Sequence, residues 1–145
     1  MVAPASEVVR VVGRLARRYW PGPLTVVVPR GPNFAADLGG PPSARTTVGV
    51  RLPDHLLVQG LCREVGPLAV TSANIHGDPP ATAAHEVMES FPESDGIGIV
   101  VDGGRCDGTP STVVECRGET LRCLREGAIP WSEVLGRWRD ASAPG

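Results

Sequence analysis

Glycine and proline occur so often in this chain that it must fold into a domain rich in loops and fixed turns. The 145 residues include 18 glycines and 15 prolines, together about 23% of the chain and roughly twice their average usage of ~12%. Between these breaks, short apolar runs alternate with amphipathic segments. This alternation predicts an α/β domain with parallel strand pairs where helices cross over. At this length one domain is the natural count.

The spacing of apolar side chains predicts four helices, and β-branched apolar runs predict six strands. The expected helices cover residues 6–19, 54–64 and 82–91, with a fourth beginning at Pro130. The expected strands cover residues 24–28, 47–51, 68–70, 97–101, 111–116 and 120–125. In the second helix, Leu57, Leu61 and Val65 should face the core, with Gly66 just past its end. Residues 30–46 form a long loop that suits a lid or a binding loop.

The last two expected strands read as a hairpin around Arg117, Gly118 and Glu119, because a three-residue loop with glycine suits such a turn. A register that pairs Glu115 with Leu121 would place Ser111 opposite Arg125, with their Cβ atoms about 4.5–5.5 Å apart. A slip of one residue would separate the two side chains. An ordinary edge pairing without functional meaning is the alternative interpretation.

Every basic residue in the chain is an arginine, fourteen in all, and lysine is absent. The composition therefore excludes chemistry that needs a lysine amine, such as a Schiff base or a P-loop lysine. The glycine-rich motifs G-x-G-x-x-G and G-x-x-x-x-G-K do not occur either. Any bound triphosphate would be held by arginine, hydroxyl and backbone N–H groups together with Mg²⁺.

The formal net charge of −2 argues against strong non-specific binding of nucleic acid, although a local arginine patch is compatible with it. The first expected helix carries Arg10, Arg14, Arg17 and Arg18 away from its apolar side. A solvated charged face is the favoured interpretation. A stripe that contacts RNA is the alternative.

Cysteine and histidine spacings indicate neither a metal site nor a redox motif. The residues concerned are Cys62, Cys106, Cys116, Cys123, His55, His76 and His85. We expect four reduced thiols and no structural metal held by the protein. No uncharged apolar run reaches the ~18 residues of a membrane span, and the first twenty residues lack the apolar stretch of a secretory signal. A cytoplasmic protein is the expectation.

In such sheets, ligands bind beyond the carboxyl ends of the strands. Polar side chains lie beside three of the expected strands in this sequence. Arg51 ends strand 47–51, and Thr71-Ser72-Ala73-Asn74 ends strand 68–70. The second of these groups would suit a nucleotide, or it would only cap a turn. The third group, residues 108–112, contains Ser111 at the open end of the hairpin.

Six short segments resemble, in order, those of the YrdC-like threonylcarbamoyl-adenylate synthases. They lie at residues 19–25, 48–53, 67–74, 102–104, 110–114 and 124–127, so the likeness extends from about residue 6 to 135. The resemblance implies a YrdC-like (DHBP synthase-like) fold, a twisted mixed parallel and antiparallel sheet with helices packed on it. It implies a single domain over residues 1–139, with residues 140–145 as a frayed tail.

The same resemblance implies a nucleotidyltransferase that makes L-threonylcarbamoyl-AMP from L-threonine, bicarbonate and ATP and releases pyrophosphate. The product serves the t6A modification of tRNA, so tRNA and the t6A-transferase proteins downstream are implied partners. Mg²⁺ would be held mainly by phosphates. By position, Arg51, Val70 and Ser111 resemble threonine contacts, and Thr47, Ser72 and Arg125 resemble ATP contacts. Asn74 would shape the site, and no residue is assigned as a catalytic nucleophile, since Arg51 and Arg125 would act by positioning.

Two departures from the family pattern accompany the resemblance. Family members usually carry a front section with a Thr-Asp-Thr-x-Tyr-Gly-like strand and a Lys-x-Arg motif. This sequence begins after it, so we expect either a shortened relative with that part of the fold missing or a start codon set too late. Pro80 stands where some members carry an ATP-contacting serine. The alternative functions are an RNA-binding or assembly module with reduced catalysis, and carbamoyl-adenylate chemistry on another acceptor.

Overall fold

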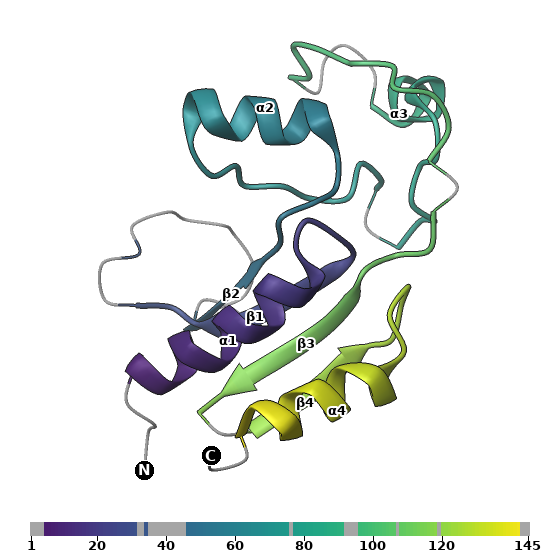
Figure 1. Cartoon of the computed structure of the whole chain (residues 1–145). Coiled ribbons are helices and arrows are strands. Elements are labelled where there is room, and N and C mark those ends of the chain that lie inside the picture. The colour runs from purple at the N-terminus through teal and green to yellow at the C-terminus, as the bar shows by residue number, and fades with distance from the viewer. Residues whose placement is uncertain are drawn as a thin grey trace. The chain divides into compact units, whose positions relative to one another are not determined.

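The computed structural model describes residues 5–31, 34, 46–75, 77–91, 96–106, 108–118 and 120–142 (Figure 1). The chain divides into two compact units, one made of Met1–Pro67 with Thr109–Gly145 and the other of Leu68–Gly108. A single domain over residues 1–139 therefore stays a prediction. Most of the expected loop 30–46 lies outside the described residues.

A four-stranded mixed sheet forms the first unit. Its strands are β1 (Leu24–Pro29), β2 (Thr47–Val50), β3 (Thr112–Arg117) and β4 (Thr120–Arg125). They lie in the order β2-β1-β3-β4. β1 pairs parallel with β3 and antiparallel with β2, and β3 and β4 form the expected hairpin. The α/β class and the mixed sheet are thus confirmed, and four of the six expected strands form within one residue of their expected ends.

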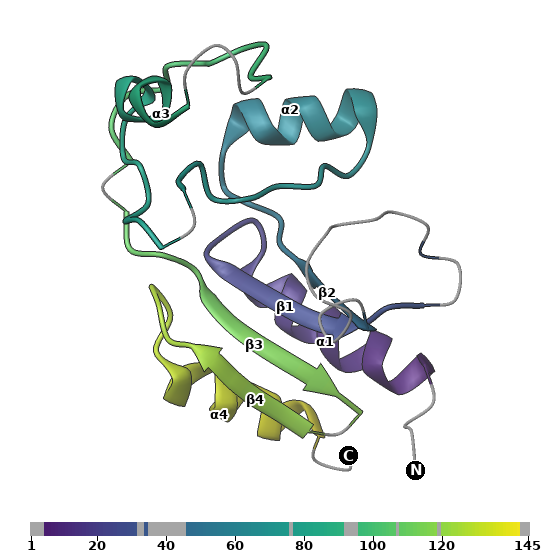
Figure 2. The ribbon, with the colours of Figure 1, turned by 180° about the vertical axis from the view of Figure 1, so that it is seen from behind.

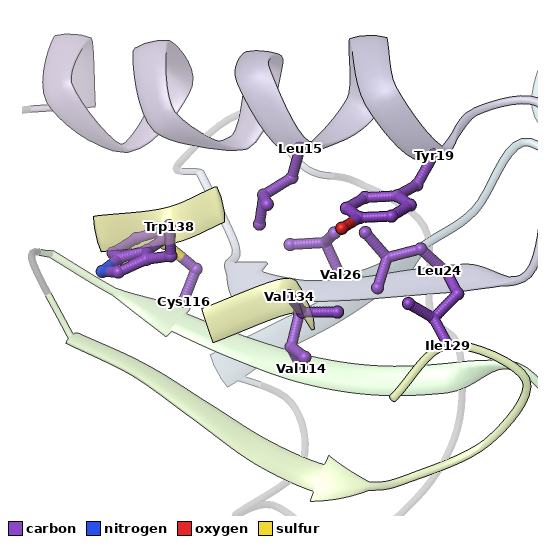
Figure 3. Packing of buried hydrophobic residues seen from close by; sticks show 9 residues of the cluster. All are labelled: Leu15, Tyr19, Leu24, Val26, Val114, Cys116, Ile129, Val134 and Trp138. Carbon is purple, nitrogen blue, oxygen red and sulfur yellow. The ribbon is translucent and has the colours of Figure 1, made fainter. Parts of the chain in front are cut away.

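Helices α1 (Ala5–Tyr19) and α4 (Trp131–Ser142) pack on one face of this sheet and enclose the core (Figure 3). Nine side chains, none more than 7% exposed, make up this core: Leu15, Tyr19, Leu24, Val26, Val114, Cys116, Ile129, Val134 and Trp138. Burying one such large apolar side chain contributes ~1.5–3 kcal/mol. The core therefore stabilises the first unit by holding both helices on the strands. α4 continues to Ser142 and so includes three residues of the segment expected to fray.

Tyr19 is the only tyrosine in the chain and joins the two helices. Its hydroxyl donates to Glu133 Oε1 at 3.1 Å. Burial, followed by the hydrogen bond to Glu133 and the charge of that carboxylate, raises the pKa of Tyr19 above its ordinary value of 10.0. The nearby charges of Arg18 and Arg137 act in the opposite direction and are outweighed.

We expect the phenolate absorbance of the folded chain to titrate from this one residue, with a midpoint above pH 10. Because the folded pKa lies above the unfolded one, this group's contribution to stability is fully present below pH 10 and is lost as the pH rises through the folded pKa. Glu133→Gln removes the charge and keeps a side-chain oxygen, so it should lower the midpoint. A midpoint that does not move would contradict the role given to Glu133.

The second face of the sheet carries the side chains that alternate with the core residues. In β1 and β3, the buried positions are Leu24, Val26, Thr112, Val114 and Cys116, and the positions between them are half-buried. Side chains of successive strand residues point to opposite faces. In the view from behind, the strands lie in front of α1 and α4 (Figure 2). Functional side chains at alternating positions therefore share the face that these two helices leave open.

The hairpin register differs from the expected one by a single residue. Glu115 pairs with Arg122, not with Leu121, which lies opposite Cys116. An irregularity between Val113 and Val114 then adds one residue to β4, so that Arg125 lies opposite Val113. Since side chains alternate along a strand, this bulge returns Arg125 to the face that Ser111 occupies. The predicted register is wrong, but the predicted approach of the two side chains is confirmed.

Helix α2 (Leu56–Val65) begins two residues later than expected and ends before Gly66, which adopts φ 83°. None of its residues is buried. Leu57, Leu61 and Val65 are 47%, 46% and 66% exposed, so the prediction that they face the core is wrong. The 3.6-residue spacing of apolar side chains correctly predicted a helix. It does not show whether another element covers the apolar face of that helix.

The second unit contains helix α3 (Ala84–Ser90), shorter than the expected 82–91. Its N-cap is Ala83, without a side-chain hydrogen bond, and Glu86 Oε2 accepts from the backbone N–H of the preceding residue, Thr82, at 2.7 Å. The expected strands 68–70 and 97–101 do not form among the described residues. A strand requires a neighbour for its N–H and C=O groups, and the described part of this unit pairs neither segment. Those two strand predictions are wrong.

Candidate functional site

Three of the expected site residues of the first unit gather at one end of its sheet. β1 and β3 run parallel and begin there, whereas β2 and β4 run antiparallel to them and end there. Ser111 precedes β3, Arg125 ends β4, and Arg51 follows β2. Ser111 and Arg125 contact each other on the face opposite α1 and α4, and Arg51 follows β2 on the other side of β1. The sheet therefore brings one hydroxyl and two guanidinium groups, distant in sequence, to the same end.

Ser111 lies at the centre of a polar cluster. Its Oγ is 2.9 Å from Thr25 Oγ1. Arg125 Nη2 donates to the Ser111 carbonyl at 2.9 Å and approaches Ser111 Oγ at 3.2 Å, and Arg125 Nε donates to the same carbonyl at 3.2 Å. Because Ser111 is only 7% exposed, these contacts fix the orientation of its hydroxyl. A ligand at this end of the sheet would meet that hydroxyl in one defined geometry.

Thr25 is a member of this cluster that the sequence reasoning missed. It lies within one of the segments that carry the family resemblance, but it was given no role. Its polarity could have marked it as a candidate site residue, because Thr25 is the polar residue within an otherwise apolar strand, Leu24–Val28. Its partner Ser111 is 86 residues away, so the contact depends on the parallel pairing of β1 with β3.

The loop after β4 closes over the start of β3. Thr112 Oγ1, completely buried, donates to the Ile129 carbonyl at 2.6 Å and accepts from the N–H groups of Gly127 and Ile129 at 3.0 and 3.1 Å. The Ala128 N–H donates to the Pro110 carbonyl at 2.9 Å. The loop thereby holds the residues on both sides of Ser111, Pro110 and Thr112.

Thr112→Val should lower the free energy of unfolding by about 1–3 kcal/mol, because it keeps the shape and leaves three buried backbone groups without their partner. Urea unfolding measures this loss. Thr120→Val, at an exposed position at the start of β4, is the matched control and should change stability by no more than about 0.5 kcal/mol. Equal losses in the two variants would contradict the role of the Thr112 hydroxyl.

Arg51 ties the end of β2 to the turn that precedes β1. Its Nε donates to the Gly22 carbonyl at 2.9 Å, and the Gly22 N–H donates to the Leu52 carbonyl at 2.8 Å. Arg51 is exposed, and the bond to Gly22 engages its Nε. A guanidinium placed this way suits a carboxylate or a phosphate.

Thr47 does not join this cluster. It pairs with Pro29 at the far end of β1, four residues before Arg51, a separation of about 13 Å along an extended strand. Its carbonyl accepts from Arg30 Nε at 2.9 Å. The sheet end with Ser111 and Arg125 is therefore formed without Thr47.

Val70, Ser72 and Asn74 belong to the second unit. Val70 and Ser72 are exposed. Asn74 Nδ2 donates to the carbonyls of Ile75 and Asp78 at 3.0 and 2.8 Å and so closes the turn that follows residues 71–73. The side-chain amide of Asn74 therefore stabilises this turn.

The described residues contain no group of three or more histidine, cysteine, aspartate or glutamate side chains that would hold a metal ion. The side chains at the sheet end are cationic or neutral, and these are poor ligands for Mg²⁺, which prefers carboxylate and phosphate oxygens. A magnesium ion at this place would therefore need ligands from the substrate. Within the same described ranges, no helix is both long and apolar enough to cross a membrane.

The chain is similar in sequence to several known proteins. The family model Sua5–YciO–YrdC, described as telomere recombination, matches residues 2–127. A putative threonylcarbamoyl-AMP synthase of Mycobacterium tuberculosis (strain ATCC 25618 / H37Rv) is 40% identical over 126 residues, which are 84% of this chain and 56% of that protein. The threonylcarbamoyl-AMP synthase of Pyrococcus abyssi is 36% identical over 132 residues, 90% of this chain and 37% of the relative.

The chain is also similar in structure to solved proteins. The crystal structure of P. abyssi Sua5 complexed with L-threonine superposes with a TM-score of 0.72 and 32% sequence identity, over 94% of this chain and 41% of that one. The solution structure of the MTH1692 protein from Methanobacterium thermoautotrophicum gives a TM-score of 0.53 at 30% identity. This chain spans 56% of the M. tuberculosis relative, 37% of the P. abyssi synthase and 62% of MTH1692.

Proposed function

The chain belongs to the Sua5–YciO–YrdC family, and from this premise we propose that it takes part in the synthesis of L-threonylcarbamoyl-AMP. The substrates would be L-threonine, bicarbonate and ATP, and the second product would be pyrophosphate. The polar cluster around Ser111, with Arg125 on one side and Arg51 at the same sheet end, is the observation that carries the proposal. A relative of similar fold was crystallised with L-threonine, which supports an amino acid as one ligand.

The reactants explain why guanidinium groups would be required. A carboxylate, bicarbonate and a triphosphate are all anions, and their repulsion must be offset before they can react. Arginine offers a forked, permanently charged donor set that matches carboxylate and phosphate oxygens. In the proposal, Arg51 binds the threonine carboxylate, and Ser111 and the backbone of Val70 contact the same amino acid. Arg125, through its bonds to Ser111, would also orient the threonine site.

The proposed chemistry proceeds in two steps without a protein nucleophile. The threonine amine first adds to bicarbonate, and loss of water gives the carbamate. A carbamate oxygen then attacks the α-phosphate of ATP, the bond to the β-phosphate oxygen breaks, and pyrophosphate leaves. Catalysis would come from positioning and charge stabilisation. Thr47, Ser72 and Arg125 are the proposed ATP contacts, and Asn74 would shape the turn that carries Ser72.

The remaining parts of the proposal concern partners and location. Mg²⁺ would be bound mainly by the ATP phosphates, which fits the lack of a carboxylate cluster among the described residues. The product would pass to the transferase proteins that form t6A on tRNA, with tRNA itself as a possible contact. We also propose that the protein is cytoplasmic, which is the location that the sequence analysis predicts.

The test is pyrophosphate release from ATP by the purified chain. We expect release that requires L-threonine and bicarbonate together and that falls to background when either is omitted. Release that continues without threonine, or that another acceptor supports equally well, would overturn the proposal in favour of different carbamoyl-adenylate chemistry. A folded chain that neither releases pyrophosphate nor binds threonine would also overturn it.

A further inference from the structure

Gly49 lies within strand β2, at a position where the fold itself does not require a glycine. It pairs with Val27 of β1. Its backbone is not in the left-handed conformation, and a Cβ built on it would lie 3.5 Å from Thr25 Cγ2 and 3.8 Å from Val27 Cγ2. These are ordinary contact distances. Because glycine weakens a strand compared with a residue that has a side chain, stability alone would favour alanine here.

The missing side chain belongs to the face of the sheet that α1 and α4 leave open. Leu24 and Val26 of β1 are completely buried in the core. Since side chains alternate along a strand, Thr25 and Val27 point to the open face. A Cβ at residue 49 would contact the methyl groups of both and so would lie on that face too. Gly49 is exposed, and β2 therefore presents only backbone at this point of the open face.

The exposed backbone at Gly49 adjoins the polar cluster around Ser111. Thr25 links the two, because its methyl group would contact a Cβ at residue 49, and its hydroxyl oxygen lies 2.9 Å from Ser111 Oγ. Gly49, Thr25 and Ser111 thus follow one another across β2, β1 and the start of β3. A ligand that contacts Ser111 and extends past Thr25 toward β2 would lie over the backbone of Gly49.

Gly49 also lies midway between two residues of β2 and its extension that have proposed roles. Thr47, the proposed ATP contact, is two residues before it, and Arg51, the proposed contact of the threonine carboxylate, is two residues after it. Each is about 7 Å away along an extended strand. In the proposed reaction, the carbamate oxygen must reach the α-phosphate between these two contacts. That junction falls over residue 49, where a side chain would occupy its space.

We propose that Gly49 is a specificity-determining residue, whose lack of a side chain lets the linkage between the carbamate and the α-phosphate lie directly on the backbone of β2. The inference rests on the proposed function and names the class of ligand that needs the glycine, an adenylate joined to an amino-acid carbamate. L-Threonine alone, bound at Arg51 and Ser111, does not extend over residue 49. Its binding is therefore independent of the glycine.

Protection of a strand edge is the alternative reason for a glycine at this position. β2 lies at one end of the four-stranded sheet. A free strand edge can pair with another molecule, and residues of low strand propensity reduce that risk. The two explanations predict different results when a side chain is added, because only the first predicts a loss of ligand binding.

The test compares the original chain with Gly49→Ala and Gly49→Val by calorimetric titration. The probes are L-threonine and a stable analogue of the product in which a sulfamoyl group replaces the phosphate. The affinity for the analogue should fall about tenfold in Gly49→Ala and further in Gly49→Val, whereas the affinity for threonine should change by less than about twofold. In urea unfolding, Gly49→Ala should be at least as stable as the original, which separates occlusion of a ligand from damage to the fold.

Gly136→Ala is the matched control, because it adds the same methyl group to α4, where a Cβ meets nothing within 4 Å. It should leave both affinities unchanged. If Gly49→Val does not fold, Gly49→Ala decides the question.

Three results would overturn the proposal. Unchanged binding of the analogue in the Gly49 variants would show that no ligand lies over this residue. An equal loss of affinity for threonine and for the analogue would indicate a general disturbance of the sheet end. Self-association of Gly49→Val with full affinity for the analogue would assign the glycine to edge protection. An original chain that binds neither probe would refute the proposed function itself, so the two failures can be told apart.

Discussion

Gly127→Ala should destabilise the protein by about 3 kcal/mol, at the upper end of the cost of overpacking. A Cβ at residue 127 would lie 2.6 Å from the Ser111 carbonyl carbon and 2.7 Å from its oxygen, and it would also collide with the Pro110 carbonyl oxygen. These are backbone atoms. The bonds from Ala128 to Pro110 and from Gly127 to Thr112 hold them in place, so no flexible side chain can move away to make room.

Urea unfolding of this variant has a matched control within the chain. Gly136 lies in the exposed part of α4, and a Cβ there would meet nothing within 4 Å. Gly136→Ala should therefore stabilise the protein by about 0.5–1 kcal/mol through helix propensity. A Gly127→Ala protein as stable as the original would show that the loop after β4 does not pack on Ser111, and the account of the site would lose its support.

Arg51→Ala and Arg125→Ala should differ in their effects on the two substrates. If Arg51 meets only the threonine carboxylate, its removal should raise the KM for threonine about 10- to 100-fold, the value of a charge-assisted hydrogen bond of about 1.5–3 kcal/mol, with little change for ATP. Arg125 is a proposed ATP contact that also holds Ser111. Its removal should therefore raise the KM for both ATP and threonine.

Steady-state pyrophosphate release at varied threonine and varied ATP measures both effects. Arg125→Lys keeps the charge and loses the fork, so it should restore part of the ATP interaction while Ser111 stays poorly held. Arg122→Ala, an exposed arginine three residues earlier on β4, controls for a general change in charge. Equal effects of Arg51→Ala on threonine and ATP would contradict the separate role given to Arg51.

Local periodicity predicted the elements that the structure confirms. The stripe of α1, the apolar run of β1 and the glycine turn of the hairpin each contain their own signal within about ten residues. Contacts between distant segments were harder to predict. The pairing of Thr25 with Ser111 follows from a parallel β1–β3 register that joins residues 86 positions apart, and no local pattern encodes it.

The hairpin shows how an error of one residue can leave a functional conclusion intact. Pattern and turn length indicated two strands, but they could not reveal the irregularity between Val113 and Val114. Without it, the observed pairing of Glu115 with Arg122 would turn Arg125 toward the core face. The extra residue in β4 returns it to Ser111. The bulge is thus the feature that assembles this half of the candidate site.

The incorrect predictions share a physical cause. Leu57, Leu61 and Val65 form a regular apolar stripe, and residues 68–70 and 97–101 have strand-like composition. Helix stripes and strands are stable only against a partner surface or a neighbouring strand, and the described residues of the chain supply none to these segments. The composition of a segment shows that it could pair with another strand or pack on another surface, but it does not show whether that strand or surface is present.

Binding of L-threonine to the chain labelled with nitrogen-15, followed by backbone amide chemical shifts, tests the central claim most directly. The account predicts saturable shifts that concentrate at Thr25, Arg51, Ser111 and Gly127 and that disappear in Ser111→Ala. The amides of Arg14 and Arg137 on the helix layer should not move. Saturable shifts confined to other parts of a folded protein, or none at all, would contradict a threonine site at this end of the sheet.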